Sequence, residues 1–168
     1  MSWPGERGRT GGVDRIPLPV EQGGLWLCGK HFVGPDVEEA MRRTGATVVV
    51  CLNESAELAD RYPEYVAWLR SDERALWHPI PDLHAPPLEE ARVLLQRLGA
   101  LVEAGEVLLV HCGAGIGRAG TVAAGLLLTM GLTADEALAT VAAHRASAGP
   151  EAGAQRDLLA ALAAGMIP

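Results

Sequence analysis

The segment from His111 to Thr121 has the residue types and spacing best suited to chemistry: His-Cys-Gly-Ala-Gly-Ile-Gly-Arg-Ala-Gly-Thr. Its four glycines cost conformational entropy, so they indicate a tight loop that serves a site rather than stability. Such a loop at the start of a helix can turn its amide N–H groups inward and bind an anion. The same field favours the thiolate of Cys112, and Arg118 can grip two oxygens of a tetrahedral anion. The segment therefore predicts hydrolysis of a phosphate ester through a phosphocysteine.

A strand must lead into this loop and a helix must follow it, and the rest of the chain predicts both. From Leu25 onward, short β-rich runs alternate with longer helical patterns. The predicted strands are 25–28, 46–52, 75–80 and 106–110, and the predicted helices are 36–44, 63–69, 88–104, 117–130, 134–145 and 151–164. This alternation favours an α/β three-layer sandwich, in which helices flank a central, mostly parallel sheet of four to five strands. Ligands bind beyond the carboxyl ends of such strands, so we expect the site at the loops after residues 52, 80 and 110.

Length and composition limit the alternatives. The 168 residues suit one domain, with residues 1–15 as a flexible, Gly-rich arm and 16–168 as the folded unit. A net charge of −7 argues against nucleic acid or a membrane surface as a partner. The longest apolar stretch, of about 14 residues, is too short to span a bilayer. Three cysteines without a C-x-x-C pair favour a reducing compartment, so we expect a cytoplasmic monomer.

The His111-Cys112-x5-Arg118 spacing resembles the signature of the cysteine-dependent protein tyrosine phosphatase superfamily. The whole segment is similar to that of its small dual-specificity members, of the kinase-associated phosphatase type. The run His-Pro-Ile-Pro-Asp that ends at Asp82, 30 residues before Cys112, resembles the aspartate loop of that family. Residues 50–54 resemble the strand and turn that precede this loop, and the helical tail with Gln155 is similar to the closing segment.

The resemblance implies the protein tyrosine phosphatase-like fold and a role for each matching residue. Cys112 is the expected nucleophile, Arg118 the clamp on the phosphate, and Asp82 the general acid and then the base. His111 is expected to orient and tune the thiolate, and Thr121 and Gln155 are supporting residues, with Gln155 either positioning water or simply solvated. The amide cradle consists of Gly113, Ala114, Gly115, Ile116, Gly117 and Arg118.

The implied substrate is a protein phosphorylated on tyrosine, and also on serine or threonine. Phosphate, vanadate or sulfate should bind the loop. Neither a metal nor a cofactor is needed, because the cradle and Arg118 balance the phosphate charge. Ala119 is a departure from the family, which usually has Ser or Thr there to stabilise the departing thiolate. Because the Thr121 hydroxyl lies two residues further on and need not reach the thiolate, we expect slower hydrolysis of the phosphoenzyme.

Other readings of these residues remain open to different degrees. Residues 115–120 match the G-x-G-x-x-G dinucleotide fingerprint, but residues 132–136 begin a helix where that reading requires a strand ending in an acidic residue. Cys51 could form a protective disulfide with Cys112, although a buried core thiol is the favoured reading. A phosphoinositide or small-molecule phosphatase is disfavoured because the loop carries no basic residue before Arg118. A phospho-binding module without turnover, and a sulfur-transfer or arsenate-reducing enzyme, are the remaining alternatives.

Overall fold

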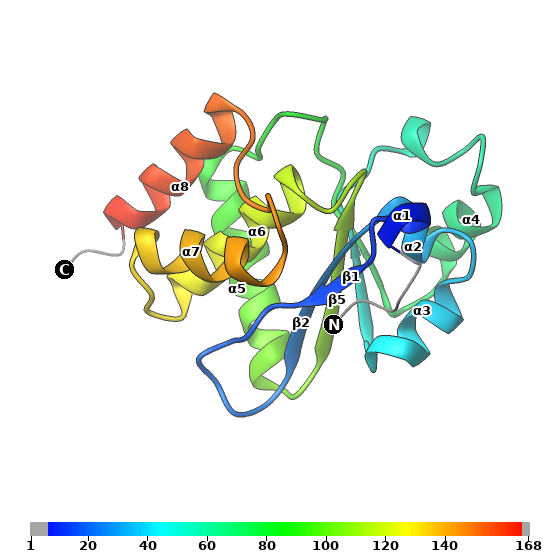
Figure 1. Ribbon diagram of the computed structural model, residues 1–168, viewed down its shortest axis with the longest axis horizontal. Coiled ribbons are helices and arrows are strands. Elements are labelled where there is room, and N and C mark those ends of the chain that lie inside the picture. The colour runs from blue at the N-terminus through cyan, green and yellow to red at the C-terminus, as the bar shows by residue number, and fades with distance from the viewer. Residues whose placement is uncertain (1–6, 166–168) are drawn as a thin grey trace.

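A five-stranded sheet runs through the middle of the computed structural model, which describes residues 7–165 (Figure 1). The strand order is β1-β2-β5-β3-β4, and β2, β5, β3 and β4 are parallel, whereas β1 is antiparallel to β2. The strands are β1 Val13–Arg15, β2 Gly24–Gly29, β3 Val48–Cys51, β4 Ala75–Trp77 and β5 Val107–Cys112. The predicted mostly parallel sheet is therefore confirmed.

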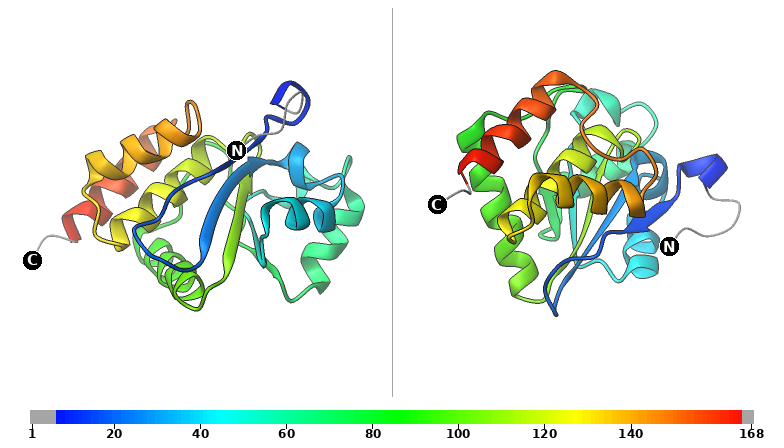
Figure 2. Two further views of the ribbon diagram at one scale, coloured as in Figure 1. Left: turned by 60° about the horizontal axis from the view of Figure 1, so that its bottom comes forward. Right: turned by 60° about the vertical axis from the view of Figure 1, so that its left-hand side comes forward.

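Helices cover both faces of the sheet, which makes the three layers of the predicted sandwich (Figure 2). One face carries α5 Leu88–Glu103, α6 Gly117–Thr129, α7 Ala134–His144 and α8 Gly153–Gly165. The other carries α2 Lys30–Val33, α3 Val37–Thr44 and α4 Pro63–Ser71. A separate apolar core fills each interface, and β5 contributes to both because its side chains alternate between the two faces. No helix within residues 7–165 is long and apolar enough to cross a bilayer.

Local signals place most element ends close to the predicted ones. Asp36 caps α3 by accepting a hydrogen bond from the Glu39 N–H, and Gly45 ends it in the left-handed conformation at φ 74°. Strand β4 stops at Trp77, earlier than the predicted residue 80. The His78 N–H still donates to the Cys51 carbonyl at the end of β3, but the Ile80 N–H donates to the Leu52 carbonyl, one residue further on rather than two, so the regular parallel ladder ends there.

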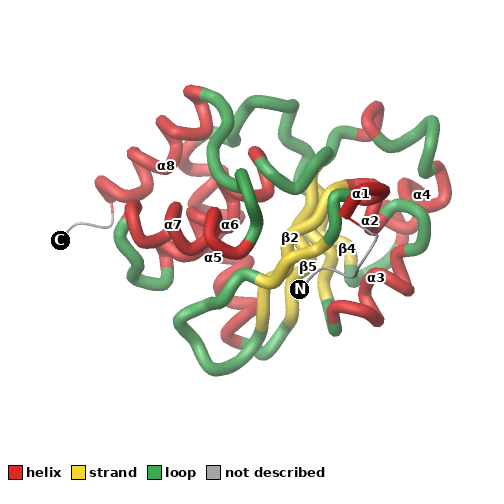
Figure 3. The backbone as a smooth tube through the Cα atoms, in the orientation of Figure 1, coloured by secondary structure: helices red, strands yellow, loops and turns green. Residues whose placement is uncertain are grey.

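The expectation of a flexible arm is wrong for the part of it that the structure describes. Residues 1–6 lie outside the described residues, but Arg7–Thr10 form the short helix α1 and Val13–Arg15 form β1. Strand β1 pairs with Trp26–Cys28 at the edge of the sheet (Figure 3). Val13 and Asp14 are buried. Three residues carry no periodic pattern, so only the partners of Val13 and Asp14 elsewhere in the chain could reveal this strand.

Candidate active site

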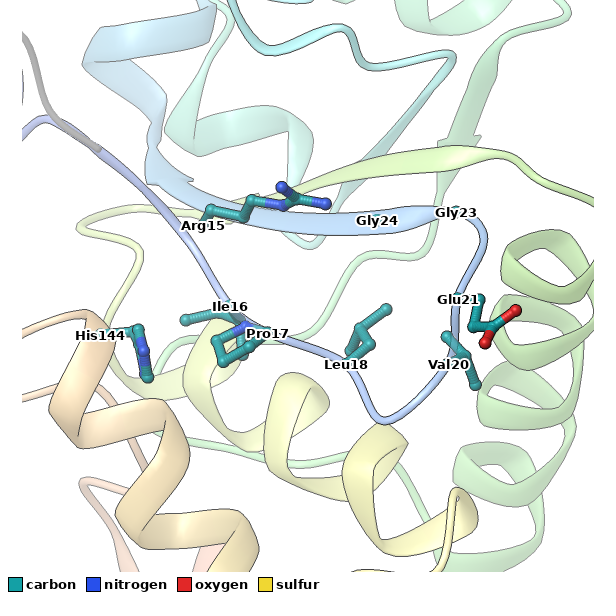
Figure 4. A pocket seen from close by; sticks show the side chains of 9 residues that line it. All are labelled: Arg15, Ile16, Pro17, Leu18, Val20, Glu21, Gly23, Gly24 and His144. Atoms are coloured by element: carbon teal, nitrogen blue, oxygen red, sulfur yellow. The ribbon is translucent and has the colours of Figure 1, made fainter.

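The predicted loop connects the end of β5 to the start of α6, and a cavity of about 320 Å³ opens beside it. The cavity walls come from several separate segments of the chain: Lys30, Glu57, Asp82, Leu83, Cys112, Gly113, Ala114, Gly117, Arg118 and Glu151. The structure thus brings the three predicted catalytic residues into one cavity. Another cavity, of about 450 Å³, lies between the β1–β2 connection and the end of α7 (Figure 4). None of the predicted site residues lines that second cavity.

The backbone of the phosphate loop, residues 112–118, is held with its carbonyl groups turned outward. The Gly113 carbonyl accepts from the Lys30 N–H at 3.0 Å, and Arg145 donates to the carbonyls of Ala114 (2.8 Å) and Gly115 (2.9 Å). In a trans peptide the N–H of the next residue points away from the carbonyl, so three successive amides turn to the inner side of the loop. Among the described residues, the amides of 113–118 donate no backbone hydrogen bond other than those within helices and strands.

Two glycines of the loop lie in close contact with neighbouring segments. Gly115 has a φ of 74°, and a Cβ added there would lie 2.3 Å from the Cys28 carbonyl oxygen at the end of β2. A Cβ on Gly117 would lie 2.1 Å from a carboxylate oxygen of Glu151, which covers the first residue of α6. Glycine is required at Gly115, where a side chain would meet backbone, whereas at Gly117 the flexible Glu151 side chain could move aside.

Arg118 is oriented by an acidic residue that the sequence analysis did not identify. Its Nη1 and Nη2 each donate to one carboxylate oxygen of Glu57 at 2.8 Å, and Nη1 also donates to the Ile80 carbonyl. The side chain is only 3% exposed, and its Nε is buried with no partner among the described residues. Burial raises the pKa of Glu57, but hydrogen bonding to Arg118 outweighs it and lowers the pKa to about 2. The fixed guanidinium therefore keeps its Nε side for a ligand.

Asp82 lies at the rim of the cavity in a turn closed by a hydrogen bond from the His84 N–H to the Pro81 carbonyl. Its Oδ1 is 3.5 Å from Arg118 Nη2, and its side chain is 70% exposed. The next residue, Leu83, has a φ of 65°, which is strained for a side chain other than glycine. The turn thus holds a carboxyl group and an exposed apolar side chain at the entrance to the cavity.

His111 is fully buried on the face of β5 opposite to Cys112, as alternation along a strand requires. Its Nε2 lies 2.6 Å from the Tyr65 hydroxyl, and its Nδ1 lies 3.4 Å from the Cys112 carbonyl oxygen. Burial lowers the pKa of His111 to about 4, so the imidazole is neutral at neutral pH. Its link to the nucleophile runs through the backbone of Cys112.

The two residues predicted to support the site lie behind it. The Thr121 hydroxyl donates to the Gly117 carbonyl at 2.7 Å, within its own helix. Gln155 is buried, and it accepts from the Glu151 N–H and donates to the His84 carbonyl, so it joins α8 to the aspartate turn. Gln155 does not line the cavity. Glu151, which lies just before α8, does.

Cys51 lies in the apolar core on the helix α4 side of the sheet, whereas Cys112 belongs to the core on the other side. Cys51 is level with His111 in the strand register, which places its side chain on the His111 face. Burial raises the pKa of the Cys51 thiol to about 12. These observations favour the core-thiol reading over a disulfide with Cys112. Within residues 7–165, no three His, Cys, Asp or Glu side chains gather as a metal-ligand set.

Comparison with known proteins gives the family. The family model for the "Swiss Army Knife" DSP-PTPase phosphatase domain matches residues 30–163. No curated protein matches the chain. The solved structure of Tk-PTP in its active form is 29% identical, covers 86% of this chain and 93% of its own, and has a TM-score of 0.68.

Two further solved structures share the fold. Kinase associated phosphatase with its catalytic-site cysteine replaced by serine is 21% identical, with coverage of 92% and 94% and a TM-score of 0.77. PTPMT1 in complex with PI(5)P is 18% identical, with coverage of 84% and 91% and a TM-score of 0.67. The match over residues 30–163, on a phosphate loop of this geometry, shows that the chain belongs to the DSP-PTPase phosphatase domain family, the small cysteine-based dual-specificity phosphatases of the protein tyrosine phosphatase superfamily.

Proposed function

We propose that this protein hydrolyses phosphotyrosine in proteins, with Cys112 as nucleophile, Arg118 as phosphate clamp and Asp82 as general acid. The observation that carries the proposal is the pairing of unused donors with a thiol. Among residues 7–165, the amides of the phosphate loop donate no hydrogen bond beyond those within helices and strands, and Arg118 Nε donates none. Cys112 lies in the same cavity. Donors that are already in place stabilise the negative charge on the phosphoryl oxygens in the transition state.

In the first step the phosphate occupies the loop, and the amides and Arg118 bind its three non-bridging oxygens. The Cys112 thiolate attacks phosphorus, an S–P bond forms, and the bond to the tyrosine oxygen breaks. Asp82 gives its proton to that oxygen, so the phenol leaves uncharged. Glu57 keeps the guanidinium in place throughout, because both terminal nitrogens of Arg118 remain bound to it.

In the second step water replaces the phenol. Asp82, now a carboxylate, removes a proton from the water as its oxygen attacks phosphorus. The S–P bond breaks, the electron pair returns to sulfur, and inorganic phosphate is released. Ala119 is buried beside the loop and offers no hydroxyl to the departing thiolate, and Thr121 has already donated its own to Gly117.

The lining of the cavity favours a protein substrate over a polyphosphorylated lipid. No side chain between Cys112 and Arg118 is basic. The Glu57 carboxylate is neutralised by Arg118, and the one ammonium in the lining, that of Lys30, donates to the Glu57 carbonyl. The carboxylates of Asp82 and Glu151 therefore leave the lining without surplus positive charge for additional phosphates on a headgroup. The apolar side chain of Leu83 at the entrance suits an aromatic ring. PTPMT1, whose structure holds PI(5)P, makes phosphoinositides the comparison to include in a test.

The test is a panel of phosphotyrosine, phosphoserine and phosphothreonine peptides and phosphoinositide vesicles, assayed by phosphate release, together with p-nitrophenyl phosphate. We expect the highest kcat/KM on phosphotyrosine peptides. Cys112→Ser should abolish turnover, whereas Cys51→Ala, which removes a thiol outside the cavity, should leave it measurable. Asp82→Asn should slow release of phenols of high pKa far more than p-nitrophenol. Turnover that survives Cys112→Ser, or a preference for phosphoinositides, would overturn the proposal.

A further inference from the structure

A buried ion pair lies behind the phosphate loop, on the side to which its carbonyls point. Arg145 follows α7, and its side chain is 2% exposed. Nε and Nη2 donate to the carbonyls of Gly115 and Ala114, which are consecutive peptides of the loop. One rigid, planar guanidinium therefore sets the orientation of two peptide units that a phosphate would contact through their other side.

The counter-charge of Arg145 comes from the N-terminal strand, 131 residues away in sequence. Arg145 Nη1 donates to Asp14 Oδ2 at 2.8 Å and to the Gly12 carbonyl at 3.3 Å. Asp14 is the one carboxylate paired with Arg145 among the described residues, and its side chain is 9% exposed. A guanidinium buried to this degree needs such a partner, since an uncompensated buried charge is costly.

The Asp14 carboxyl group is ionised at neutral pH. Burial raises the pKa of Asp14, but the hydrogen bonds and positive charges of Arg7 and Arg145 outweigh it and hold the pKa below its ordinary value. Asp14 Oδ1 also accepts from Arg7 Nη2 at 2.8 Å. The carboxylate is thus fixed on both oxygens, and Arg145 meets a preorganised partner rather than a mobile one.

We propose that Asp14 is a positioning residue for the phosphate loop, a role that extends the proposed phosphatase function to the N-terminal strand. By holding Nη1, Asp14 directs Nε and Nη2 of Arg145 onto the carbonyls of Gly115 and Ala114. Those carbonyls then stay turned away from the phosphate, and the amides of Gly115 and Ile116 stay turned toward it. Without the carboxylate, the guanidinium would move toward other acceptors or water, and either peptide could rotate.

A purely structural role for the ion pair gives a different expectation. Asp14 could do no more than fasten β1 to the body of the protein. Its replacement would then lower the melting temperature, but the molecules that remain folded would bind an oxyanion normally. The positioning role instead predicts weaker anion binding by the folded protein, because the loss lies in the orientation of the amides.

The experiment compares Asp14→Asn with wild type in the full chain, at a temperature where circular dichroism shows both to be folded. Tungstate affinity is measured by calorimetry, and kcat and KM are measured with p-nitrophenyl phosphate. We expect the tungstate Kd and KM to rise by roughly 10- to 100-fold. Arg145→Lys keeps a positive charge opposite Asp14 but cannot reach both carbonyls, and it should show the same loss. Asp72→Asn, which breaks a surface ion pair with Arg74, is the matched control and should change neither quantity.

Folded Asp14→Asn with wild-type tungstate affinity and KM would overturn the positioning role and leave the phosphatase function intact. Conversely, a wild-type protein that hydrolyses no phosphate ester, but binds tungstate more tightly than Asp14→Asn, would refute the function and support the positioning. If Asp14→Asn does not fold, Asp14→Glu carries the test by the same criteria, because it keeps the charge and displaces it by one methylene.

Discussion

Arg118 and Glu57 form a two-point ion pair, in which Nη1 meets Oε2 and Nη2 meets Oε1, both at 2.8 Å. Glu57 lies in a short 3-10 helix, Ser55–Glu57, just after β3, and Arg118 lies in the first turn of α6. The pair therefore ties the loop after one parallel strand to the helix after its neighbour. It uses the terminal nitrogens of the guanidinium and leaves Nε available.

Glu57→Gln should lower activity through its effect on the orientation of Arg118. The amide can accept only one of the two hydrogen bonds, and its NH₂ group faces a cationic partner, so Arg118 loses its fixed orientation. We expect kcat/KM for p-nitrophenyl phosphate to fall by roughly 10- to 100-fold, as for other residues that orient a binding group. The melting temperature should also fall, because the buried guanidinium loses its counter-charge.

The matched control for that change is Glu73→Gln, the same substitution at an exposed carboxylate outside the cavity. It should leave kcat/KM within about twofold of wild type, as surface substitutions usually have small effects. Wild-type kcat/KM in Glu57→Gln would mean that the remaining Ile80 carbonyl and the packing around Arg118 suffice to orient it.

Ala119 should make breakdown of the phosphoenzyme slow relative to its formation. No hydroxyl follows Arg118, and the Thr121 hydroxyl is bound to the Gly117 carbonyl. We expect a burst of p-nitrophenol in rapid-quench experiments, followed by a slower steady state. Ala119→Ser should reduce the burst and raise kcat by about 10-fold, less than the roughly 100-fold effect of an oxyanion-hole donor, because the loop amides already stabilise the thiolate. A wild-type protein without a burst, or a serine variant with unchanged kcat, would contradict this account.

The sequence predicted those parts of the site whose determinants are close together. The Cys112-to-Arg118 spacing lies within one loop, and Asp36, Gly45 and Thr133 are local signals that end or begin helices where expected. The mostly parallel sheet followed from alternating strand and helix patterns, because strands that are joined by crossover helices pair in parallel.

The parts that sequence reasoning missed depend on distant partners. Glu57 is 61 residues from Arg118, and Asp14 is 131 residues from Arg145. A carboxylate in a polar stretch carries no signal of the guanidinium that it will meet. Gln155 illustrates the same point from the other direction. Its type suggested contact with water, but the side chain is buried and its amide binds the Glu151 N–H and the His84 carbonyl.

His111 should make the protein less stable in mild acid. Its pKa is about 4 in the folded state, against an ordinary value near 6.5, so between these values the unfolded chain binds a proton that the folded chain does not. The free energy of unfolding must therefore fall as the pH drops from about 6.5 toward 4, with a limiting slope of about 1.4 kcal/mol per pH unit.

Urea unfolding of wild type and His111→Gln at several pH values checks this expectation. The variant has no imidazole to protonate. Its free energy of unfolding should therefore change less steeply with pH between about 4 and 6.5, by up to about 1.4 kcal/mol per pH unit. Glu57 titrates toward its pKa of about 2 in both proteins and cancels in the difference. Equal slopes in the two proteins would show that other groups account for the acid sensitivity.

Gly115 and Gly45 offer a direct measure of how tightly the phosphate loop packs against β2. Both have a φ of 74°, so replacement by alanine imposes left-handed backbone strain at each, on the order of 1 to 2 kcal/mol. They differ in their surroundings, because an added Cβ meets nothing within 4 Å at Gly45 but lies 2.3 Å from the Cys28 carbonyl oxygen at Gly115. Gly115→Ala should therefore lose more stability than Gly45→Ala, and it should lose activity because the loop must move away from β2. Melting curves and p-nitrophenyl phosphate kinetics distinguish the two effects. Equal losses of stability, with full activity in Gly115→Ala, would mean that the loop can shift without disturbing the amides that face the phosphate.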